Sequence, residues 1–376
     1  MIADPPRAEA VVDLGAIAEN YTRVSSAGVP VMGIVKADGY GHGARQVART
    51  LRDCGAQWLG VALPSEALEL RAGGDRGRLL AWLWVPGDPS VVDCIATDVD
   101  LSISCEQSLI DVVSAARGLR KQARIHIKVD TGLTRNGVPR SSWDSVFQAA
   151  RVAQDEGFVE IVGIWSHLAS ADEPADPFTD QQRAAFLEAV DMAASVGVEP
   201  ELLHIANSAA AINRPDCAFD LVRSGIAIYG VTPGTGLGSA RSLGLRPAMT
   251  LRTRLAHVKA IDVGDKVSYG GTWTATRPTT VGLVPVGYAD GIPRAASNKG
   301  TVLINGRRCP VLGVIAMDQF VVDLGPAAVD RQGDEVLVFG TGDHGEPTAE
   351  DWANWAGSIG YEIVTRIGPR VPRRYV

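Results

Sequence analysis

What this sequence lacks excludes several classes of protein. The chain of 376 residues has only five cysteines, none of them in a Cys-x-x-Cys pair: Cys54, Cys94, Cys105, Cys217 and Cys309. Scattered cysteines in odd number predict neither a disulfide framework nor a zinc site. We therefore expect no metal centre, and a reducing cytoplasm is the simplest location for the protein.

Long apolar runs are also absent. The most apolar window covers residues 79–85, far short of the ~20 residues that a membrane span requires. The first residues, MIADPPRAEAVVDL, lack a basic head followed by a long apolar segment and so predict no secretory signal. Lys and Arg number 36 against 43 Asp and Glu, a net charge of −7 without long runs of one sign. This balance argues against nucleic acid or a membrane as a partner.

From about residue 30 to residue 230, apolar runs alternate with longer amphipathic segments. Strands are predicted at 31–35, 58–62, 80–84, 99–103, 124–129, 160–166, 202–205 and 226–229. Helices are predicted between them near 43–54, 64–72, 88–97, 105–117, 141–157, 178–196 and 207–213. Eight strands joined by helices predict an α/β fold, a parallel (β/α)8 TIM-type barrel, for which roughly 200 to 250 residues is typical. An open doubly wound sheet is the alternative, but no Gly-x-Gly-x-x-Gly fingerprint follows the first strand.

After about residue 240 the segments become short, Val-rich and separated by Gly or Pro, which predicts a mostly antiparallel β-domain. Its strands are expected at 248–262, 265–270, 279–287, 301–304, 308–315, 319–324 and 334–339, followed by a helix near 348–357 and a final strand near 361–366. Asn305-Gly306 predicts a hairpin turn. The Gly- and Pro-rich residues 233–238 form the linker candidate, so we assign the barrel to 1–240 and the β-domain to 241–376.

One stretch, VMGIVKADGYGHG at residues 31–43, joins a buried strand to a Gly-rich loop. Lys36 stands where the conformation changes, and Tyr40 and His42 follow it. A lysine at the end of a buried strand loses hydration, which lowers the pKa of its amine and favours the nucleophilic free base. Such an amine can form a Schiff base with an aldehyde such as pyridoxal phosphate. The alternative is an exposed lysine in a flexible loop.

Other polar groups interrupt or end the predicted strands, where a barrel carries its chemistry. Lys128 interrupts an apolar run and is either an outward-facing strand residue or a buried, paired one. A lone histidine such as His167 is more often a hydrogen-bonded core residue than a catalyst. Asn207 or Ser208 is an ordinary N-cap for the Ala-rich turn after it, and a helix start also suits a phosphate. Gly225 permits close approach of the backbone.

VKADGYGHG strongly resembles the cofactor-lysine signature of alanine racemases, which are fold-type III pyridoxal-phosphate enzymes. The resemblance runs over nearly the whole chain and ends in YEIVTRIGPRVPR at residues 361–373. It implies a barrel followed by a small β-domain. It also implies that the first strand, here about residues 10–13, packs with the C-terminal domain.

The resemblance implies a role for each matching residue, with Lys36 carrying pyridoxal 5'-phosphate. Lys128 matches a lysine that is often carbamylated, and a carbamate can hold a guanidinium by paired hydrogen bonds. Arg135 matches the arginine so held, which donates to the phenolic oxygen of the cofactor and lies near the substrate carboxylate. His167 matches a residue beside the cofactor ring. The remaining cofactor-binding residues so implied, mostly around the phosphate, are Tyr40, Asn207, Ser208, Gly225, Ile226 and Tyr361.

Arg223 matches the arginine that faces the pyridine nitrogen in this family. A guanidinium has no acceptor and cannot usefully give up a proton. The ring nitrogen would therefore stay unprotonated, which makes the ring a weaker electron sink. Aminotransferases and related decarboxylases place an acidic partner there. An arginine suits an enzyme whose only task is to remove a proton and return it to the other face.

Returning the proton requires a second acid–base group on the opposite side. SYGGT at residues 268–272 matches the motif that carries this group, which implies the role for Tyr269 of the partner subunit. A homodimer with composite active sites follows. Tyr288 matches a tyrosine that lines the substrate entrance, and Met317 matches a methionine whose main-chain amide reaches the substrate carboxylate. Ala316 stands where the family often has cysteine or serine, which leaves the substrate range open.

We therefore expect a homodimeric racemase that interconverts L- and D-alanine by a two-base mechanism using Lys36 and Tyr269 of the partner subunit. One alternative is a racemase of another small amino acid such as serine. A second is a fold-type III amino-acid decarboxylase, against which Arg223 counts. A third is a cofactor-carrying barrel protein without turnover, against which the β-domain with Tyr269 and Met317 counts.

Overall fold

Two sheets organise this computed structural model, which describes residues 6–25 and 28–376. The first sheet has eight strands in the order β8-β7-β6-β5-β4-β3-β2-β9, and every neighbouring pair is parallel. These strands are β2 (Val31–Ile34), β3 (Trp58–Val61), β4 (Arg78–Ala81), β5 (Asp100–Ile103), β6 (Ala123–Lys128), β7 (Val159–Trp165), β8 (Leu202–His204) and β9 (Val222–Ser224).

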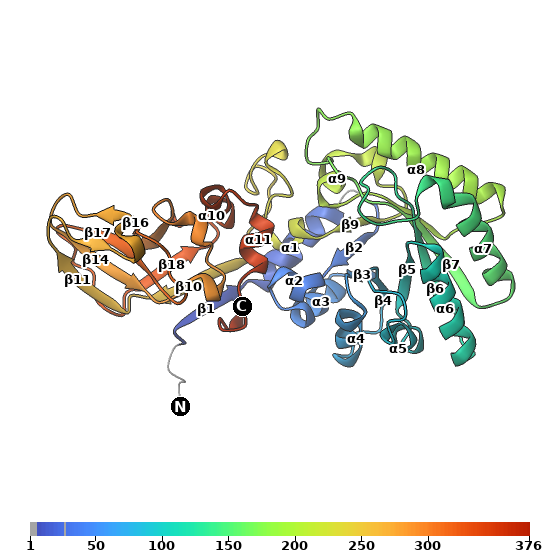
Figure 1. Cartoon of the computed structure of the whole chain (residues 1–376), viewed down its shortest axis with the longest axis horizontal. Coiled ribbons are helices and arrows are strands. Elements are labelled where there is room, and N and C mark those ends of the chain that lie inside the picture. Colours follow the sequence, from blue (N-terminus) through green and yellow to red (C-terminus); the bar gives the residue numbers. More distant parts are fainter. Residues whose placement is uncertain (1–5, 26–27) are drawn as a thin grey trace.

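Helices join successive strands and surround the barrel, on the right in Figure 1. They are α1 (Leu14–Ser25), α2 (Lys36–Tyr40), α3 (Ala44–Asp53), α4 (Pro64–Ala72), α5 (Ser90–Ala96), α6 (Glu106–Leu119), α7 (Trp143–Asp155), α8 (Phe178–Ser195) and α9 (Ser208–Asn213). Arg223 N in β9 donates a hydrogen bond of 3.0 Å to the main-chain oxygen of Ala206, two residues after the end of β8, so the barrel is nearly closed. Every residue of β2, β3 and β5 is buried, as a parallel sheet covered by helices requires.

The second sheet is mostly antiparallel and forms the β-domain, on the left in Figure 1. Its order is β11-β14-β17-β16-β15-β18-β10-β1-β19. The strands are β1 (Ala8–Val12), β10 (Met249–Arg254), β11 (His257–Ile261), β14 (Thr279–Val284), β15 (Thr301–Ile304), β16 (Arg307–Leu312), β17 (Phe320–Gly325), β18 (Glu335–Phe339) and β19 (Arg373–Tyr375). A small sheet pairs β12 (Lys266–Val267) with β13 (Trp273–Thr274). The predicted barrel followed by a β-domain is confirmed.

The first strand of the chain belongs to the second sheet. β1 pairs antiparallel with β10, where Ala10 faces Leu251, and parallel with β19, where Ala10 faces Arg373. The whole barrel is therefore interposed in the sequence between two neighbouring strands of the β-domain. The predicted hairpin at Asn305-Gly306 is present between β15 and β16, and both residues have positive φ, 48° and 73°.

Two predicted strands are wrong. Residues 226–229 form a 3₁₀ helix, and the last barrel strand is the earlier β9. All four residues of this 3₁₀ helix are buried, so their apolar character reflects burial and not strand structure. Residues 361–366 fall in and just after a helix, α11 (Gly360–Thr365), which packs against α10 (Ala349–Ala356). Tertiary packing of Ile363 and Val364 overrides their strand propensity there.

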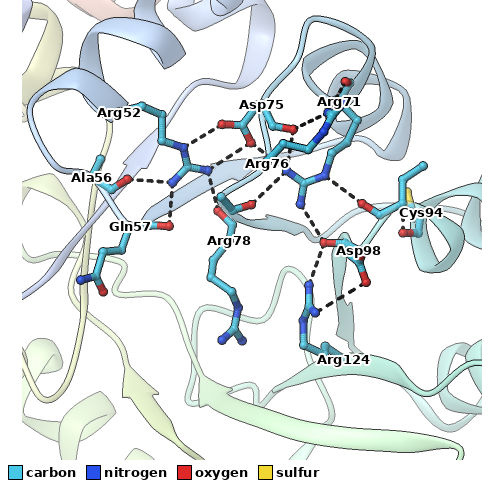
Figure 2. A network of polar contacts seen from close by, with 12 residues as sticks. Arg52, Ala56, Gln57, Arg71, Asp75, Arg76, Arg78, Cys94, Asp98 and Arg124 are labelled. Atoms are coloured by element: carbon cyan, nitrogen blue, oxygen red, sulfur yellow. Dashed lines mark hydrogen bonds and ion pairs between the residues drawn. The ribbon is translucent and has the colours of Figure 1, made fainter.

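Arginine side chains link the loops at the amino-terminal ends of the barrel strands through ion pairs and hydrogen bonds (Figure 2). Arg52 Nε lies 2.7 Å from Asp75 Oδ1, and Arg71 Nη1 lies 2.8 Å from Asp75 Oδ2. Both guanidinium groups also donate to main-chain carbonyls, such as that of Asp98 for Arg71. Residues at this end of a barrel serve stability, whereas chemistry lies at the opposite end.

Residues 6–25 and 28–376 contain neither a membrane-spanning helix nor a cluster of metal-ligating side chains. No helix there has the length and apolar character that crossing a membrane would need. No cluster of three or more His, Cys, Asp or Glu side chains is arranged to hold a metal ion.

Candidate active site

A cavity of about 310 Å³ opens at the carboxyl ends of the barrel strands. This is the end at which barrels carry their chemistry, because the loops there can vary without disturbing the sheet. Most of the residues predicted for the site meet in this cavity. Its lining consists of Ile34, Lys36, Tyr40, Trp82, Lys128, Arg135, Trp165, His167, Asn207, Ser208, Arg223, Gly225, Ile226 and Tyr361.

Lys36 is placed by an unusual turn. It begins α2, in which residues 37–40 all have positive φ between 52° and 61°. Residues with a side chain lose roughly 1–2 kcal/mol each in this left-handed region. Glu66 holds the turn by accepting a hydrogen bond of 2.6 Å from Ala37 N, and Asp38 accepts one of 2.8 Å from Ala44 N. Strain of this kind concentrates at functional sites, where the surrounding structure keeps it in place.

Two lysine amines in the cavity have lowered pKa values. Burial is the largest cause for Lys36, and the charge of Arg135 lowers its pKa further. Burial lowers the pKa of Lys128 to about 8, with Arg223 and Arg135 adding repulsion. Lys128 is only 4% exposed, and its Nζ lies 4.7 Å from the ring centre of Trp165, so it is not an outward-facing strand residue. Both amines are therefore more readily deprotonated than exposed lysines.

A group of hydroxyls and amides lines another part of the cavity. Ser208 Oγ accepts a hydrogen bond of 2.8 Å from Gly225 N. A Cβ at Gly225 would overlap with the hydroxyl of Tyr40, so only glycine leaves room for that hydroxyl. The ring of Tyr361 lies 6.3 Å from the ring of Tyr40. Asn207 caps α9, its Oδ1 accepting from Ala210 N at 3.1 Å, and it also borders the cavity. These groups suit an anion with several oxygen acceptors.

Arg223 lies at the base of the site and is 5% exposed. Its Nη2 donates to the main-chain oxygens of Ser166 at 2.7 Å and Ile205 at 3.1 Å. The same nitrogen lies 3.3 Å from His167 Nδ1, and since an arginine only donates, this His167 nitrogen is the acceptor. Burial lowers the pKa of Arg223 to about 9, which still leaves the group charged at neutral pH. Burial and the nearby Arg223 also place the pKa of His167 well below its ordinary value.

A wider cleft of about 670 Å³ adjoins the cavity and shares Arg135, His167, Asn207 and Tyr361 with it. Its other wall comes from the C-terminal part of the chain, including Glu350 and Ile359. The cavity is thus approached between the barrel and the helices α10 and α11.

Three predicted site residues are not in this cavity. Tyr269 is 72% exposed, Tyr288 is 45% exposed and Met317 is 51% exposed. All three belong to the β-domain, where the main chains of Ala289 and Met317 are joined by a hydrogen bond of 2.9 Å. Within one chain, therefore, Lys36 faces the cavity without Tyr269 among its lining residues.

Sequence reasoning missed two tryptophans and several buried polar groups. Trp82 lines the cavity with its ring centre 5.8 Å from Lys36 Nζ, and Trp165 stacks on His204 with ring centres 5.6 Å apart. His126 lies in β6 two residues before Lys128, and alternate residues of a strand face the same side. That alternation is the signal which could have drawn His126 to attention.

The donor set fits a phosphorylated aldehyde. Lys36 supplies an amine of lowered pKa, the group around Tyr40, Ser208 and Gly225 supplies room and donors for a phosphate, and Arg223 supplies a fixed donor. Together with the barrel and the β-domain, these features are those that an enzyme of the class working through a lysine-bound carbonyl group would require.

Comparison with known proteins identifies the family within this class. Residues 12–233 match the model described as alanine racemase, N-terminal domain, and residues 248–375 match alanine racemase, C-terminal domain. The chain is 48% identical to an alanine racemase of Frankia casuarinae over 98% of this chain and 96% of the relative. It is 49% identical to one of Thermobifida fusca, with 98% of each chain covered. The crystal structure of alanine racemase from D-cycloserine-producing Streptomyces lavendulae is 49% identical and superposes with a TM-score of 0.97, covering 99% of this chain and 98% of that one. The chain belongs to the alanine racemase family, and it is an isomerase.

Proposed function

We propose that this protein interconverts L- and D-alanine with pyridoxal 5'-phosphate as cofactor, as a homodimer in the cytoplasm that supplies D-alanine. The observation that carries the proposal is the pair of Lys36 and Arg223 in one cavity, the first an amine of lowered pKa and the second a donor-only cation. Bound at Lys36, the cofactor supplies the electron sink that makes the α-proton of an amino acid removable.

The other residues around the cavity would bind the cofactor and orient the substrate. Tyr40, Ser208, Gly225, Ile226 and Tyr361 would hold the phosphate, with Asn207 beside them and His167 next to the ring. Arg223 would donate to the ring nitrogen without protonating it, which favours simple proton return over transamination. Arg135 would orient the substrate carboxylate together with the main-chain amide of Met317. Lys128, once carbamylated, would hold Arg135 in place.

Proton transfer needs one group on each face of the substrate. Lys36 would remove or return the α-proton on one face and Tyr269 of the partner subunit on the other. Two facts support a contribution from a second chain: Tyr269 is 72% exposed, and it is not among the residues that line the cavity of its own chain. Tyr288, which is also exposed, would line the entrance to the completed site.

The test is incubation of the purified holoenzyme with a panel of L- and D-amino acids, followed by chiral chromatography. Equal approach to the racemic mixture from L- and D-alanine is expected. Release of carbon dioxide would instead support a decarboxylase, and faster turnover of serine than of alanine would shift the substrate assignment. No turnover of any amino acid would overturn the proposal.

A further inference from the structure

A line of buried hydrogen bonds runs from Arg223 into the barrel interior. Arg223 Nη1 lies 3.1 Å from His204 Nδ1, His204 Nε2 lies 3.0 Å from His126 Nδ1, and His126 Nε2 lies 3.4 Å from Asp100 Oδ2. His204, His126 and Asp100 are all 0% exposed. The four residues come from β9, β8, β6 and β5, so the line crosses the barrel beneath the cavity.

The chemistry of arginine fixes the direction of every bond in this line. A guanidinium only donates, so His204 Nδ1 must be the acceptor and His204 must carry its proton on Nε2. That proton points to His126 Nδ1, which must then be an acceptor, and His126 in turn donates from Nε2 to Asp100. Both imidazoles are therefore neutral Nε2–H tautomers. A second proton on either ring would place one N–H against another.

At the other end of the line, Asp100 is held in place by two arginines. Asp100 accepts hydrogen bonds of 2.6 Å from Arg124 Nε and 3.1 Å from Arg78 Nη2. Both arginines belong to the group at the amino-terminal ends of the strands (Figure 2). The ring of Trp165 lies parallel to His204, at an angle of 8°. The carboxylate and the imidazoles are thus held in place from outside the line.

At the Arg223 end of the line, one N–H group of the guanidinium is not used in these hydrogen bonds. Nη1 donates to the main-chain oxygen of His204 at 3.0 Å as well as to its ring, and Nη2 has three acceptors. Within residues 6–25 and 28–376, the hydrogen bonds of the Arg223 side chain all use Nη1 or Nη2 and leave Nε–H unused, and Arg223 borders the cavity. The two terminal nitrogens are used to hold the group, and Nε–H is the donor available to a ligand.

We propose that Asp100, His126 and His204 are positioning residues, which fix the guanidinium plane of Arg223 so that its Nε–H serves the cofactor ring. The inference rests on the proposed function for the identity of that ring, whereas the order of donors and acceptors rests on this chain alone. The role of the line is to prevent Arg223 from rotating or exchanging its acceptors when the ring nitrogen gains electron density.

The first experiment reads the tautomers directly. The full-length protein, labelled with ¹⁵N at histidine, is compared with and without cofactor by NMR. The sequence has six histidines, so single-histidine variants assign the signals. His126 and His204 should each show a protonated Nε2 and a bare Nδ1. An Nδ1–H tautomer or an imidazolium at either residue would overturn the line, whether or not the enzyme racemises alanine.

The second experiment separates positioning from simple packing. In His126→Gln the side-chain carbonyl can accept from His204 and the amide can donate to Asp100, whereas His126→Leu can do neither. The leucine variant should change the absorbance spectrum of the bound cofactor and lower kcat by roughly tenfold or more with a smaller change in KM. The glutamine variant should recover most of the loss.

Equal behaviour of the two His126 variants, with both folded by circular dichroism, would overturn the positioning role. If the leucine variant does not fold, Asp100→Asn replaces it, since this change removes the charge and keeps the shape. An unchanged cofactor spectrum and an unchanged kcat in that variant would also contradict the proposal. Failure of the proposed function would look different, because the wild-type protein would then show the expected tautomers without racemising alanine.

Discussion

Gly225 lies directly against the hydroxyl of Tyr40, and a methyl group at position 225 would occupy the same space as that oxygen. Both residues line the cavity in which we place the cofactor phosphate. Close approach of this kind is a reason for glycine that does not depend on backbone conformation, because Gly225 does not have positive φ.

Gly225→Ala should therefore displace the Tyr40 hydroxyl and weaken cofactor binding by at least about tenfold, the cost of roughly one displaced phosphate contact. The measurement is a titration of the cofactor-free protein followed by absorbance. Gly118→Ala is a matched control, since nothing lies within 4 Å of a Cβ at that position in α6. Equal affinity of the two variants would contradict the assignment.

Lys36→Ala and Tyr269→Phe should damage opposite directions of the reaction. Each base serves one face, so each loss should slow exchange of the α-proton for one enantiomer more than for the other, by roughly 10²–10⁴-fold. Deuterium incorporation from D₂O into L- and D-alanine, followed by mass spectrometry, measures the two rates. Small and equal losses for both enantiomers would exclude a two-base mechanism that uses these residues.

Mixing the two inactive variants tests whether the sites are shared between subunits. A dimer of one Lys36→Ala chain and one Tyr269→Phe chain contains one intact site, if each site takes Tyr269 from the partner subunit. Random reassociation makes half of the dimers mixed, so about a quarter of wild-type activity should return. If both residues act within one chain, the mixture should stay inactive.

Lys128 should make stability depend on pH. Its folded-state pKa is about 8 against an ordinary 10.5, so the folded protein binds this proton more weakly than the unfolded chain. Below pH 8 the charged amine destabilises the fold in full, and this penalty is lost as the pH rises toward 10.5. The free energy of unfolding should therefore rise across that window, on the order of 3 kcal/mol relative to Lys128→Met.

Urea unfolding of both proteins at several pH values in buffer free of carbon dioxide measures this difference. The control is the variant itself, which lacks the titrating amine and should show a flatter profile. Two parallel profiles would mean that Lys128 is not buried as a free amine. If the neutral amine of Lys128 reacts with carbon dioxide to form a carbamate, addition of bicarbonate should stabilise the wild type.

Much of the site could be predicted from the sequence because of how a barrel is built. Lys36 and His167 each follow a predicted strand directly, Ser208 comes three residues after one, and parallel strands bring their carboxyl ends together. Asp100, His126 and His204 were not predicted. They belong to the strands β5, β6 and β8, and a polar residue inside a strand does not mark a loop in the sequence. Trp165 was missed since an aromatic residue in a strand is ordinarily core.

The errors in the fold have the same physical origin. Residues 226–229 and 361–366 are rich in β-branched or aromatic side chains, and these favour strands only where no tertiary contact decides otherwise. In both segments burial against neighbouring elements imposes helical structure. The position of Tyr269 relative to Lys36 of another chain depends on how two copies associate, and local sequence patterns do not encode that arrangement.

The pairing of β1 with β10 and β19 has a consequence for biosynthesis. On the ribosome β1 emerges before the barrel, yet both of its neighbours are made only after the barrel has been translated. The nascent chain must carry an unpaired edge strand through most of its synthesis, a state open to aggregation. Circular permutation that places β1 directly before β10 should shorten that delay and raise the yield of correctly assembled protein.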